Sequence, residues 1–402
     1  MIKNSVASKP KRAVIIGCGI AGPAVALFLK RAGIEAEIYE ASELDESEVG
    51  LFLNVARNGM SILKELGVDE EIRRLGIEMV TLRMMNSRGK LLGAVGTKSG
   101  EPQGYTLKRH ELHRVLREAA MRLGIKIEFG KRLKAFTIDP AAHSVTALFE
   151  DGSSATGDFV VGCDGIHSQT RKWILPDAPP PRYTGLISFG GYLRNGFGIP
   201  HVPGAQHLVF GKKAFFGYLA KRDGEIYWFG NIDYPGRPTR RELMSIPQQT
   251  WREKITGLYK DDTDPVPEIV RRTEDELLFY PIYDLPPQPR WHDGPIVLAG
   301  DAVHATSPNA GQGASLALED AMVLAKCVRD IPDLDHAFLR YTELRKDRVE
   351  RIVRYSRQIG NRKHATNPVQ VFFRDLLLPM FLKLADKQSN AWLYDYRVDW
   401  KM

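Results

Sequence analysis

Residues 11–40 read KRAVIIGCGIAGPAVALFLKRAGIEAEIYE, and this stretch decides the fold of the first part of the chain. The apolar, branched run at 12–16 predicts a buried strand, Pro23–Ala32 predicts a helix, and Ile34–Tyr39 predicts a second strand. A strand, a helix and a strand of these lengths form a βαβ unit with a glycine-rich first turn.

The glycines of that turn stand where a nucleotide phosphate has to approach the backbone. Gly17 makes the tight turn, Gly19 lets the backbone come close to a pyrophosphate, and Gly22 lets the helix lie against the strand. Around Ile20 and Ala21, a pyrophosphate meets free N–H groups and the positive end of the helix dipole. We therefore expect a dinucleotide to lie across this turn.

Glu40 stands at the end of the second predicted strand. A carboxylate at this place accepts hydrogen bonds from ribose hydroxyls and repels a 2′-phosphate. A glycine-rich turn alone matches many sequences, but a strand before it, a helix after it and an acid at the right distance favour a dinucleotide site. These features do not separate NAD from FAD.

Composition is that of an ordinary globular protein. The chain has 402 residues, enough for two domains, of which 43% are hydrophobic and 26% charged. The formal net charge of +7 is spread along the chain without a basic block, so we expect no nucleic-acid partner.

The cysteines and the apolar segments bear on location. Cys18, Cys163 and Cys327 are scattered and odd in number, which favours a reducing, cytoplasmic compartment over a disulfide framework. We expect no secretory signal in the polar first residues and no membrane-spanning segment. The apolar stretch Val371–Leu384 favours a helix that packs across the domains, with peripheral membrane contact as the alternative.

Two later motifs resemble the first in their placement. A predicted strand at 158–162 runs into Asp164-Gly165, and another at 294–300 runs into Asp301, which is followed by Gly311-Gln312-Gly313 and a long helix. Ligands of open α/β sheets bind at the carboxyl ends of the strands. One extended cofactor could therefore touch all three motifs.

The middle of the chain has a different character. Residues from Arg182 to about Pro281 are rich in β-branched and aromatic side chains, and a polar turn at 221–224 indicates a hairpin. A helix is predicted over 106–124, with Arg109 near its start, where a positive charge is unfavourable. Arg109 therefore suggests an anionic partner, although an ordinary surface arginine explains it too.

The three motifs, in this order, resemble those of the single-component FAD-dependent aromatic hydroxylases, whose type member is para-hydroxybenzoate hydroxylase. The resemblance runs from about residue 12 to 363, and residues 300–320 are most similar to the salicylate hydroxylase, zeaxanthin epoxidase and tetracycline-inactivating branches. It implies an α/β fold with a Rossmann-like FAD-binding domain of the GR2 type, formed by 1–180 and 291–365. An antiparallel substrate domain at 181–290 and a C-terminal helical segment at 366–402 complete the expected organisation.

The resemblance also implies roles for the polar residues of the motifs. Glu40 would hold the adenosine ribose, and Arg109 would approach the pyrophosphate or the ribityl chain. Asp164 and Gly165 would lie beside the pyrophosphate and take part in binding the nicotinamide nucleotide. Asp301 would bind a ribityl hydroxyl.

Other residues are expected near the flavin ring. Asn54 matches a polar position there, though more loosely. Reduced flavin is negatively charged at N1, and the helix that begins after Gly311-Gln312-Gly313 would stabilise that charge by about 1 kcal/mol. Pro308 would stiffen the loop that faces the substrate.

The implied reaction is a monooxygenation. NADH or NADPH reduces the flavin, O₂ adds to it, and a C4a-hydroperoxide passes one oxygen to an electron-rich phenolic, enolic or polycyclic small molecule. The protein would position the substrate and exclude water. Four aromatic side chains are expected to roof the flavin, with simple sheet core as the alternative for each: Phe189, Phe216, Tyr218 and Trp228.

Several alternatives stay open. The same motifs fit an epoxidase, a Baeyer–Villiger-type oxygenase or a dehydrogenase, and a flavin sensor without turnover is a hypothesis of another class. We find no catalytic triad and no metal-ligand cluster, and we interpret His304 as structural rather than as a base. The sequence leaves open the substrate, the choice of NADH or NADPH, and whether the chain is a monomer or a homodimer.

Overall fold

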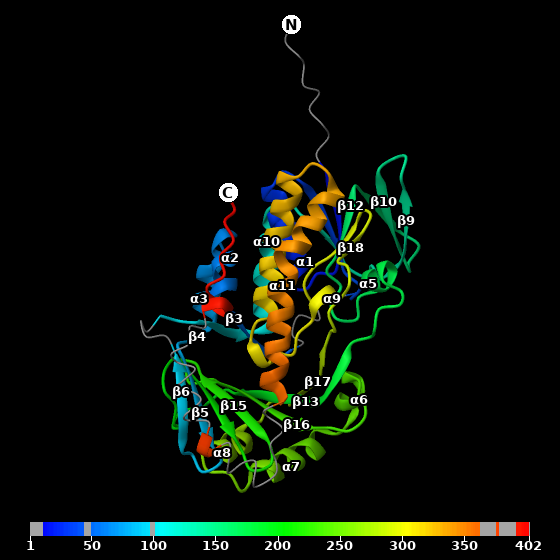
Figure 1. Ribbon diagram of the computed structural model, residues 1–402. Coiled ribbons are helices and arrows are strands. Elements are labelled where there is room, and N and C mark those ends of the chain that lie inside the picture. Colours follow the sequence, from blue (N-terminus) through cyan, green and yellow to red (C-terminus); the bar gives the residue numbers. More distant parts are fainter. Residues whose placement is uncertain (1–10, 44–49, 97–100, 362–374, 378–390, 402) are drawn as a thin grey trace.

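The computed structural model describes residues 11–43, 50–96, 101–361, 375–377 and 391–401, and Figure 1 shows how they are arranged. The chain forms an α/β body with the long helices and a second, sheet-rich body below it (Figure 1). Of the apolar stretch Val371–Leu384, only residues 375–377 lie within the described part. The expected packing helix there is therefore outside the described residues.

The first body is built on a mixed six-stranded sheet in the order β18-β19-β12-β1-β2-β8. All its neighbouring strands are parallel except the edge pair β18 and β19. The strands are β1 (Arg12–Ile16), β2 (Glu35–Tyr39), β8 (Lys126–Glu128), β12 (Phe159–Gly162), β18 (His292–Asp293) and β19 (Ile296–Leu298). The predicted βαβ unit is confirmed, and β19 returns from late in the chain beside β12.

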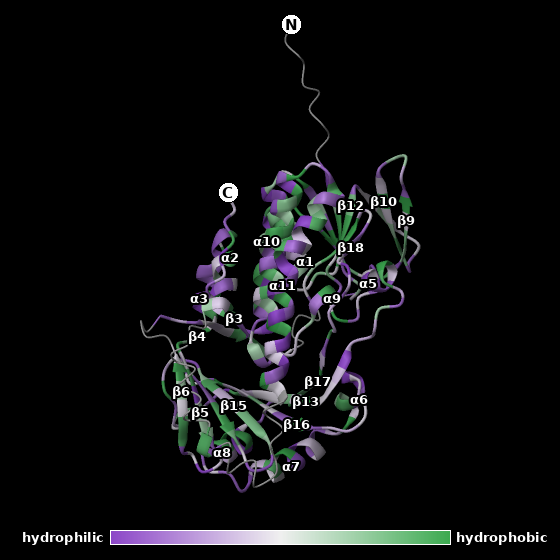
Figure 2. Cartoon of the chain, viewed as in Figure 1, coloured by the Kyte–Doolittle hydropathy of each residue, from purple (hydrophilic) through white to green (hydrophobic). Residues whose placement is uncertain are grey.

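Helices cover this sheet and supply much of its core. The main ones are α1 (Ala21–Arg31), α4 (Arg109–Arg122), α10 (Gly313–Asp330) and α11 (Leu334–Asn361). Helix α1 packs between α10 and α4, and α11 covers α10. The residues of the central strands are hydrophobic and buried, whereas α11 carries hydrophilic as well as hydrophobic residues (Figure 2). Each fully buried Val, Leu or Ile contributes roughly 1.5–3 kcal/mol.

The second body is a seven-stranded sheet in the order β17-β13-β16-β15-β14-β5-β6. Its strands are β5 (Thr81–Asn86), β6 (Leu91–Gly96), β13 (Arg182–Leu193), β14 (Ala205–Phe210), β15 (Phe215–Ala220), β16 (Ile226–Asp233) and β17 (Leu278–Asp284). Strand β5 joins β14 in a parallel pair, so the early hairpin belongs to this sheet. The expected domain boundary at residue 181 therefore leaves out two of its strands.

Three short helices pack on one face of the second sheet: α6 (Arg240–Ser245), α7 (Gln248–Tyr259) and α8 (Val266–Arg272). Helices α6 and α7 are separated by a short break in the helical backbone. Ile246 and Pro247 have extended backbone there, because the residue before a proline is pushed out of the helical region.

Small elements join the two bodies. A three-stranded sheet pairs β7 (Gly104–Lys108) with β3 (Phe52–Ala56) and β4 (Ile77–Met79), and α2 (Arg57–Glu65) and α3 (Asp69–Leu75) pack beside it. The helix predicted from Thr106 therefore begins only at Arg109, because the residues before it pair as strand β7.

The remaining elements lie around the first body: β9 (Leu133–Asp139), β10 (Ser144–Phe149), β11 (Ser154–Gly157), α5 (Gln169–Ile174), α9 (Asp301–His304), the 3₁₀ turn η2 (Pro308–Ala310) and α13 (Ala391–Tyr394). Within the described residues, no helix combines the length and apolar composition needed to cross a membrane.

The last described residues, 391–401, form a segment that we call the C-terminal strap. Its aromatic rings pack against arginines of the long helices. The guanidinium of Arg351 lies 4.0 Å from the ring centre of Trp392, that of Arg348 lies 4.2 Å from Tyr396, and that of Arg329 lies 4.5 Å from Trp400. The strap therefore ties the chain end to α10 and α11 through repeated cation–π contacts.

Candidate FAD site

The turn after β1 has the shape that a pyrophosphate requires. Gly17 has φ +104°, where side chains are strained, and a Cβ on Gly22 would lie 2.0 Å from the carbonyl oxygen of Gly17. A Cβ on Gly19 would meet no atom within 4 Å. Gly17 and Gly22 are therefore required by the protein's own packing, whereas Gly19 borders open space at the start of α1.

Glu40 lies at the end of β2 and supports this turn. One of its carboxylate oxygens accepts a 2.7 Å hydrogen bond from the backbone N–H of Cys18, and the other accepts bonds from the N–H and hydroxyl of Ser42. A carboxylate offers about four acceptor sites, so capacity remains for a ribose hydroxyl. Glu40 therefore stabilises the glycine turn. It also keeps acceptor capacity for the ribose contact that the sequence predicts.

Asp164 lies at the end of β12, but its carboxylate is used inside the protein. It accepts hydrogen bonds from the hydroxyls of Ser168 and Thr170 and from the backbone N–H groups of Gln169 and Thr170. These bonds cap the start of α5. Burial raises the pKa of Asp164, and the same bonds oppose the rise. Contact with a nucleotide at this turn would therefore fall to the backbone around Gly165, which has φ +73°.

Arg171 was not predicted to act at the site, although it belongs to the same motif. Its buried guanidinium donates to the carbonyl oxygens of Ala302 and Ile166, each at 2.7 Å. It thereby joins the turn after β12 to the turn after β19. The sequence could have indicated this role of Arg171, because it places a charged residue at the start of a predicted helix.

The turn after β19 presents a free carboxylate. Gly300 has φ +63°, and a Cβ there would lie 3.0 Å from Cβ of Ala21, so the turn packs closely on the start of α1. Asp301 follows at the first position of α9, is exposed, and makes no hydrogen bond or ion pair with a described residue. Its carboxylate is thus available for a hydroxyl of a ligand, and the ribityl contact stays a prediction.

The residues expected around the flavin ring lie together at the N-terminus of α10. Gly311 has φ +61°, and its carbonyl oxygen accepts a 3.4 Å hydrogen bond from the side-chain amide of Asn54. Gln312 is fully buried and accepts a 2.9 Å bond from Asn58. Oδ1 of Asn54 and Nε2 of Gln312 are buried without a partner among the described residues. Asn54 and Asn58 therefore hold this loop through hydrogen bonds. Oδ1 of Asn54 and Nε2 of Gln312 still have unused hydrogen-bonding capacity.

A buried cluster of charges underlies this loop. Asp320 accepts hydrogen bonds from the backbone N–H of Gly300, from Nε2 of His304 at 2.5 Å and from Nε of Arg345 at 2.8 Å. Burial alone would raise the pKa of Asp320, but His304 and Arg345 lower it to about 2. His304 is therefore held in a structural ion pair, which agrees with its interpretation from the sequence.

The same cluster reaches from the strap to the loop. Arg345 and Arg348 both pair with the fully buried Glu319, and Arg348 also donates to the carbonyl oxygen of Trp392 at 2.6 Å. Glu319 in turn accepts a 2.6 Å bond from Asn58, the residue that holds Gln312. Sequence reasoning missed this network, because Asn58 precedes its partners Gln312 and Glu319 by more than 250 residues and the other members come from different helices.

The four aromatic side chains expected to roof the flavin lie elsewhere. All are at most 1% exposed in a core that includes α7 and α8, where Phe216 stacks on Trp228 at 5.4 Å between ring centres: Phe189, Phe216, Tyr218 and Trp228. They therefore occupy the sheet face turned toward the helices. The alternative of simple sheet core is correct for these four.

The opposite face of the sheet meets the first body. Phe52 of β3 packs against the rings of Tyr192, Tyr227 and Phe229 at 5.4–6.5 Å between centres. Lys108 lies 4.5 Å from the ring centre of Tyr192. Because side chains alternate along a strand, a choice wrong by one residue exchanges the two faces. Tyr192, Tyr227 and Phe229, and not the four predicted residues, therefore point toward the first body, and we call these three the aromatic roof.

Arg109 and Pro308 lie at the margins of this site. Arg109 is exposed at the start of α4, its backbone N–H donates to the carbonyl oxygen of Leu51, and its side chain lies against Gly50. Pro308 is exposed at the start of η2, in the loop between α9 and α10. The contact of Arg109 with the pyrophosphate or ribityl chain and the contact of Pro308 with the substrate therefore stay predictions.

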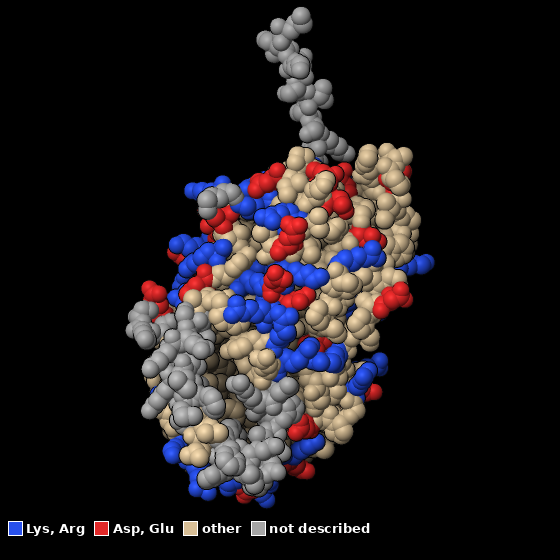
Figure 3. Space-filling model, in the orientation of Figure 1, with Lys and Arg blue, Asp and Glu red and all other residues tan. Residues whose placement is uncertain are grey.

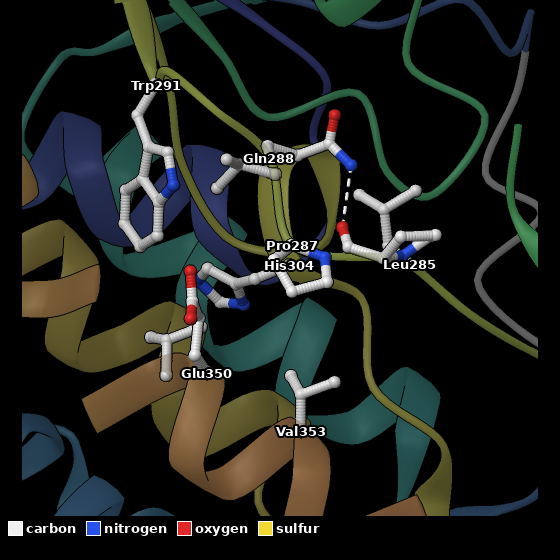
Figure 4. Close-up of a pocket in the computed structure, with 10 residues that line it drawn as sticks. Leu285, Pro287, Gln288, Trp291, His304, Glu350 and Val353 are labelled. Atoms are coloured by element: carbon white, nitrogen blue, oxygen red, sulfur yellow. Dashed lines mark hydrogen bonds between the residues drawn. The ribbon is translucent and has the colours of Figure 1, made fainter. Parts of the chain in front are cut away.

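A separate small cavity lies on the other side of α9. Figure 4 shows the His304 ring and the Trp291 indole beside it, with Glu350 and Val353 of α11 along one wall. Its free space of about 10 Å³ is enough for one water-sized molecule. Among the described residues, no group of three or more potential ligands could hold a metal ion.

Charge on the surface is mixed. On the face that α11 presents, Lys and Arg side chains are interspersed with Asp and Glu (Figure 3). The net positive charge of +7 is therefore not gathered into one patch on this face.

Comparison with known proteins agrees with this geometry. The family described as FAD binding domain matches residues 11–178 and 288–356, which is more than half of the chain. The FAD-dependent urate hydroxylase of Klebsiella oxytoca is 31% identical over 363 residues, covering 86% of this chain and 89% of that protein. Aurachin C monooxygenase/isomerase of Stigmatella aurantiaca is 29% identical over 383 residues, covering 91% and 93%.

A solved structure supports the same assignment. Klebsiella pneumoniae HpxO complexed with FAD and uric acid superposes with a TM-score of 0.81 at 25% identity, covering 94% of this chain and 96% of that one. In this chain, the glycine turn and Asp301 lie at the ends of strands β1 and β19, on either side of β12. The chain belongs to the family of single-component FAD-dependent aromatic hydroxylases and monooxygenases.

Proposed function

We propose that this protein uses NADH or NADPH and O₂ to hydroxylate an electron-rich small molecule. The observation that carries the proposal is the meeting of three ligand-binding turns on the adjacent strands β1, β12 and β19. The start of α1, the turn at Gly165 and the free carboxylate of Asp301 form one continuous rim. Such a rim matches an extended dinucleotide better than a small mononucleotide.

When bound, FAD would supply the redox and oxygen chemistry expected from the family resemblance. The chain's own residues have three tasks. The N–H groups at the start of α10 favour negative charge on a ring placed there, Glu40 and Asp301 offer acceptors for hydroxyl groups, and the aromatic roof excludes water. None of these tasks needs a dedicated acid or base, because a phenol or enol substrate supplies its own electrons.

The names of the relatives suggest where to look for a substrate. They include urate hydroxylases and 6-hydroxynicotinate 3-monooxygenase, all of which act on electron-rich rings. We propose a substrate of that general class for this chain. Among the described residues no cysteine forms a disulfide, which is compatible with the cytoplasmic location that we propose.

Two measurements on the FAD-loaded protein test the proposal. In the absence of O₂, NADH or NADPH should bleach the flavin, and the rate should rise when a suitable phenolic or heteroaromatic compound is present. With ¹⁸O₂, one labelled oxygen atom should enter the product. Oxidised product without label would identify a dehydrogenase and refute the proposal, and a flavin that never bleaches across the panel would favour a sensor.

A further inference from the structure

The C-terminal strap and the loop before α10 are linked through one buried carboxylate. Glu319 is fully buried in α10 and pairs with two arginines of α11, Arg345 at 2.5 Å and Arg348 at 2.8 Å. It also accepts a 2.6 Å hydrogen bond from the side-chain amide of Asn58 in α2. A buried carboxylate is costly unless cations and donors surround it, so displacing one of these three partners disturbs the others.

The hydrogen bonds of Asn58 have a fixed direction. An ionised carboxylate only accepts hydrogen bonds, so Asn58 turns its NH₂ group toward Glu319. The same group donates to Oε1 of Gln312 at 2.9 Å. Gln312 is fully buried and directly precedes the first residue of α10. The carboxylate therefore orients both amides, and through them it holds the backbone at the start of α10.

A second contact joins the start of α2 to the start of α10. The backbone N–H of Ala56 donates to Oγ of Ser315 at 3.0 Å, and a Cβ on Gly59 would lie 2.6 Å from the same oxygen. The two helix starts are thus packed without space between them. A shift of α2 would be passed directly to the first turn of α10.

The strap is held by the same arginine that neutralises Glu319. Arg348 donates to the carbonyl oxygens of Trp392 at 2.6 Å and Leu393 at 3.2 Å, in the short helix α13. The last carbonyl oxygens of a helix lack partners within it and attract a cation. One guanidinium therefore connects the buried carboxylate with the backbone of the strap.

Two further contacts bring the strap to this network. The ring of Tyr396 has its centre 4.2 Å from the guanidinium of Arg348 and 5.3 Å from that of Arg345. Asp395 pairs at 2.8 Å with Arg57, the first residue of α2. The red chain end in Figure 1 accordingly lies beside α2. The strap thus contacts both arginine partners of the carboxylate and the helix that carries Asn58.

We propose that Asn58 and Glu319 are positioning residues for the flavin, and that docking of the strap sets how tightly the start of α10 holds the ring of FAD. The N–H groups there favour negative charge, so reduced flavin depends on their position more than oxidised flavin does. Two contacts that bias the same element are coupled reciprocally, so FAD should in turn stabilise the docked strap. The inference rests on the ring position in the proposed function, and not on the oxygen chemistry.

Substitutions in the strap separate this coupling from a general effect on stability. Tyr396→Ala removes the ring that covers both arginine partners of Glu319. Trp400→Ala is the matched control in the same strap, because its ring packs against Arg329 and Arg31, which pair with other acids. Tyr396→Phe keeps the ring and serves as the conservative variant.

The first measurements are the dissociation constant of FAD and the reduction potential of the bound flavin. Tyr396→Ala should raise the dissociation constant about 5- to 20-fold. The potential should fall, by about 30 mV for each tenfold by which reduced FAD is weakened more than oxidised FAD. Tyr396→Phe should restore both values, and Trp400→Ala should change neither. A strap that only stabilised the fold would leave the potential where it is.

The reciprocal effect is measured on the unsubstituted protein. Binding of FAD should slow hydrogen exchange of residues 392–396 by about the same factor, 5- to 20-fold. Asn58→Ala removes the link between Glu319 and Gln312, so FAD should slow this exchange less in that variant.

Three results would overturn the inference: equal effects of Tyr396→Ala and Trp400→Ala on FAD, an unchanged potential in Tyr396→Ala, or strap exchange that does not respond to FAD. If Tyr396→Ala does not fold, the exchange measurement on the unsubstituted protein decides. Coupling between strap and FAD without ¹⁸O incorporation would refute the proposed function and leave this inference standing.

Discussion

The rim at the strand ends, which we propose binds the dinucleotide, and the sheet that we propose faces the substrate are built in opposite ways. At the rim, backbone turns form the surface: Gly17, Gly22 and Gly300 shape it, and Gly19 borders open space where we propose that the ligand lies. On the substrate sheet, side chains from separate strands form the surface, including Tyr192 of β13 and Tyr227 and Phe229 of β16. The first arrangement is local in sequence, whereas the second exists only after the strands have paired.

This difference predicts where single substitutions matter. At the rim, damage should come from added atoms, because a new Cβ occupies ligand space. Beneath the rim, damage should come from removed partners, because buried charges depend on one another. Side chains that only donate to or accept from the ligand should have the smallest effects. The predictions below follow that order.

The largest effect is expected in the buried cluster that supports the loop before α10. Arg345→Met removes a fully buried cation and leaves Glu319 and Asp320 short of a partner. Breaking a buried pair in this way costs about 3–5 kcal/mol of the free energy of unfolding. Denaturant unfolding should show this loss, with Arg340→Met as the exposed control that changes stability by less than about 0.5 kcal/mol. Equal stabilities of the two variants would contradict the role given to the cluster.

Adding a methyl group at the rim tests whether a glycine borders the ligand or other atoms of the protein. Gly19→Ala should leave the fold intact, because a Cβ there meets no protein atom within 4 Å. It should nevertheless weaken FAD binding by about 10- to 100-fold, since the methyl occupies the approach of the pyrophosphate. Gly257→Ala in α7, also with open space around its Cβ, is the control. Unchanged FAD affinity in Gly19→Ala would remove the pyrophosphate from this turn.

The pH dependence of stability tests the state of Asp320. Its pKa is lowered from 3.8 to about 2, so the folded protein holds it ionised more strongly than the unfolded chain does. The resulting stabilisation, on the order of 2 kcal/mol, is complete above the unfolded pKa and is lost as pH falls through about 2. Between pH 5 and pH 2, the free energy of unfolding should decrease less steeply for Asp320→Asn than for the unsubstituted protein. Parallel curves for the two proteins would show that another group is responsible.

Removing a single ligand acceptor should have the smallest effect. Asp301→Ala deletes an exposed carboxylate that has no partner among the described residues, so the unfolding free energy should stay within about 0.5 kcal/mol. The dissociation constant of FAD should rise about 3- to 10-fold, the value of one hydrogen bond. Glu40→Ala should weaken FAD binding and also loosen the turn, because Glu40 supports Cys18. Identical behaviour of the two variants would contradict this distinction.

The same contrast explains what could be predicted from the sequence. The turn at 17–22, the acid at the end of β2 and the motif at 300–313 are local patterns, and their strands and helices were predicted close to where they occur. The faces of the substrate strands were not predictable, because an alternating pattern gives two equivalent choices until the partners are known. The pairing of β5 with β14 and the link from Asn58 to Glu319 also depend on contacts between distant residues.

Asp164 shows a different limit. Its position at the end of β12 was predicted, but the use of its carboxylate to cap α5 was not, and its contact with a nucleotide stays a prediction. A strand-end acid can serve a ligand or the next helix, and the sequence around it is compatible with both. The four misassigned aromatic residues and Asp164 therefore share one cause, since the direction of a side chain was assumed from its place in the chain.

The most direct test of the account is a titration of the apoprotein with FAD, followed by fluorescence and absorbance. We predict saturable binding of one FAD per chain, which leaves a yellow protein, and a lower affinity in Gly19→Ala with its fold unchanged. A folded protein that stays colourless with excess FAD, or one that binds FAD equally well with the added methyl group, would contradict the central claim.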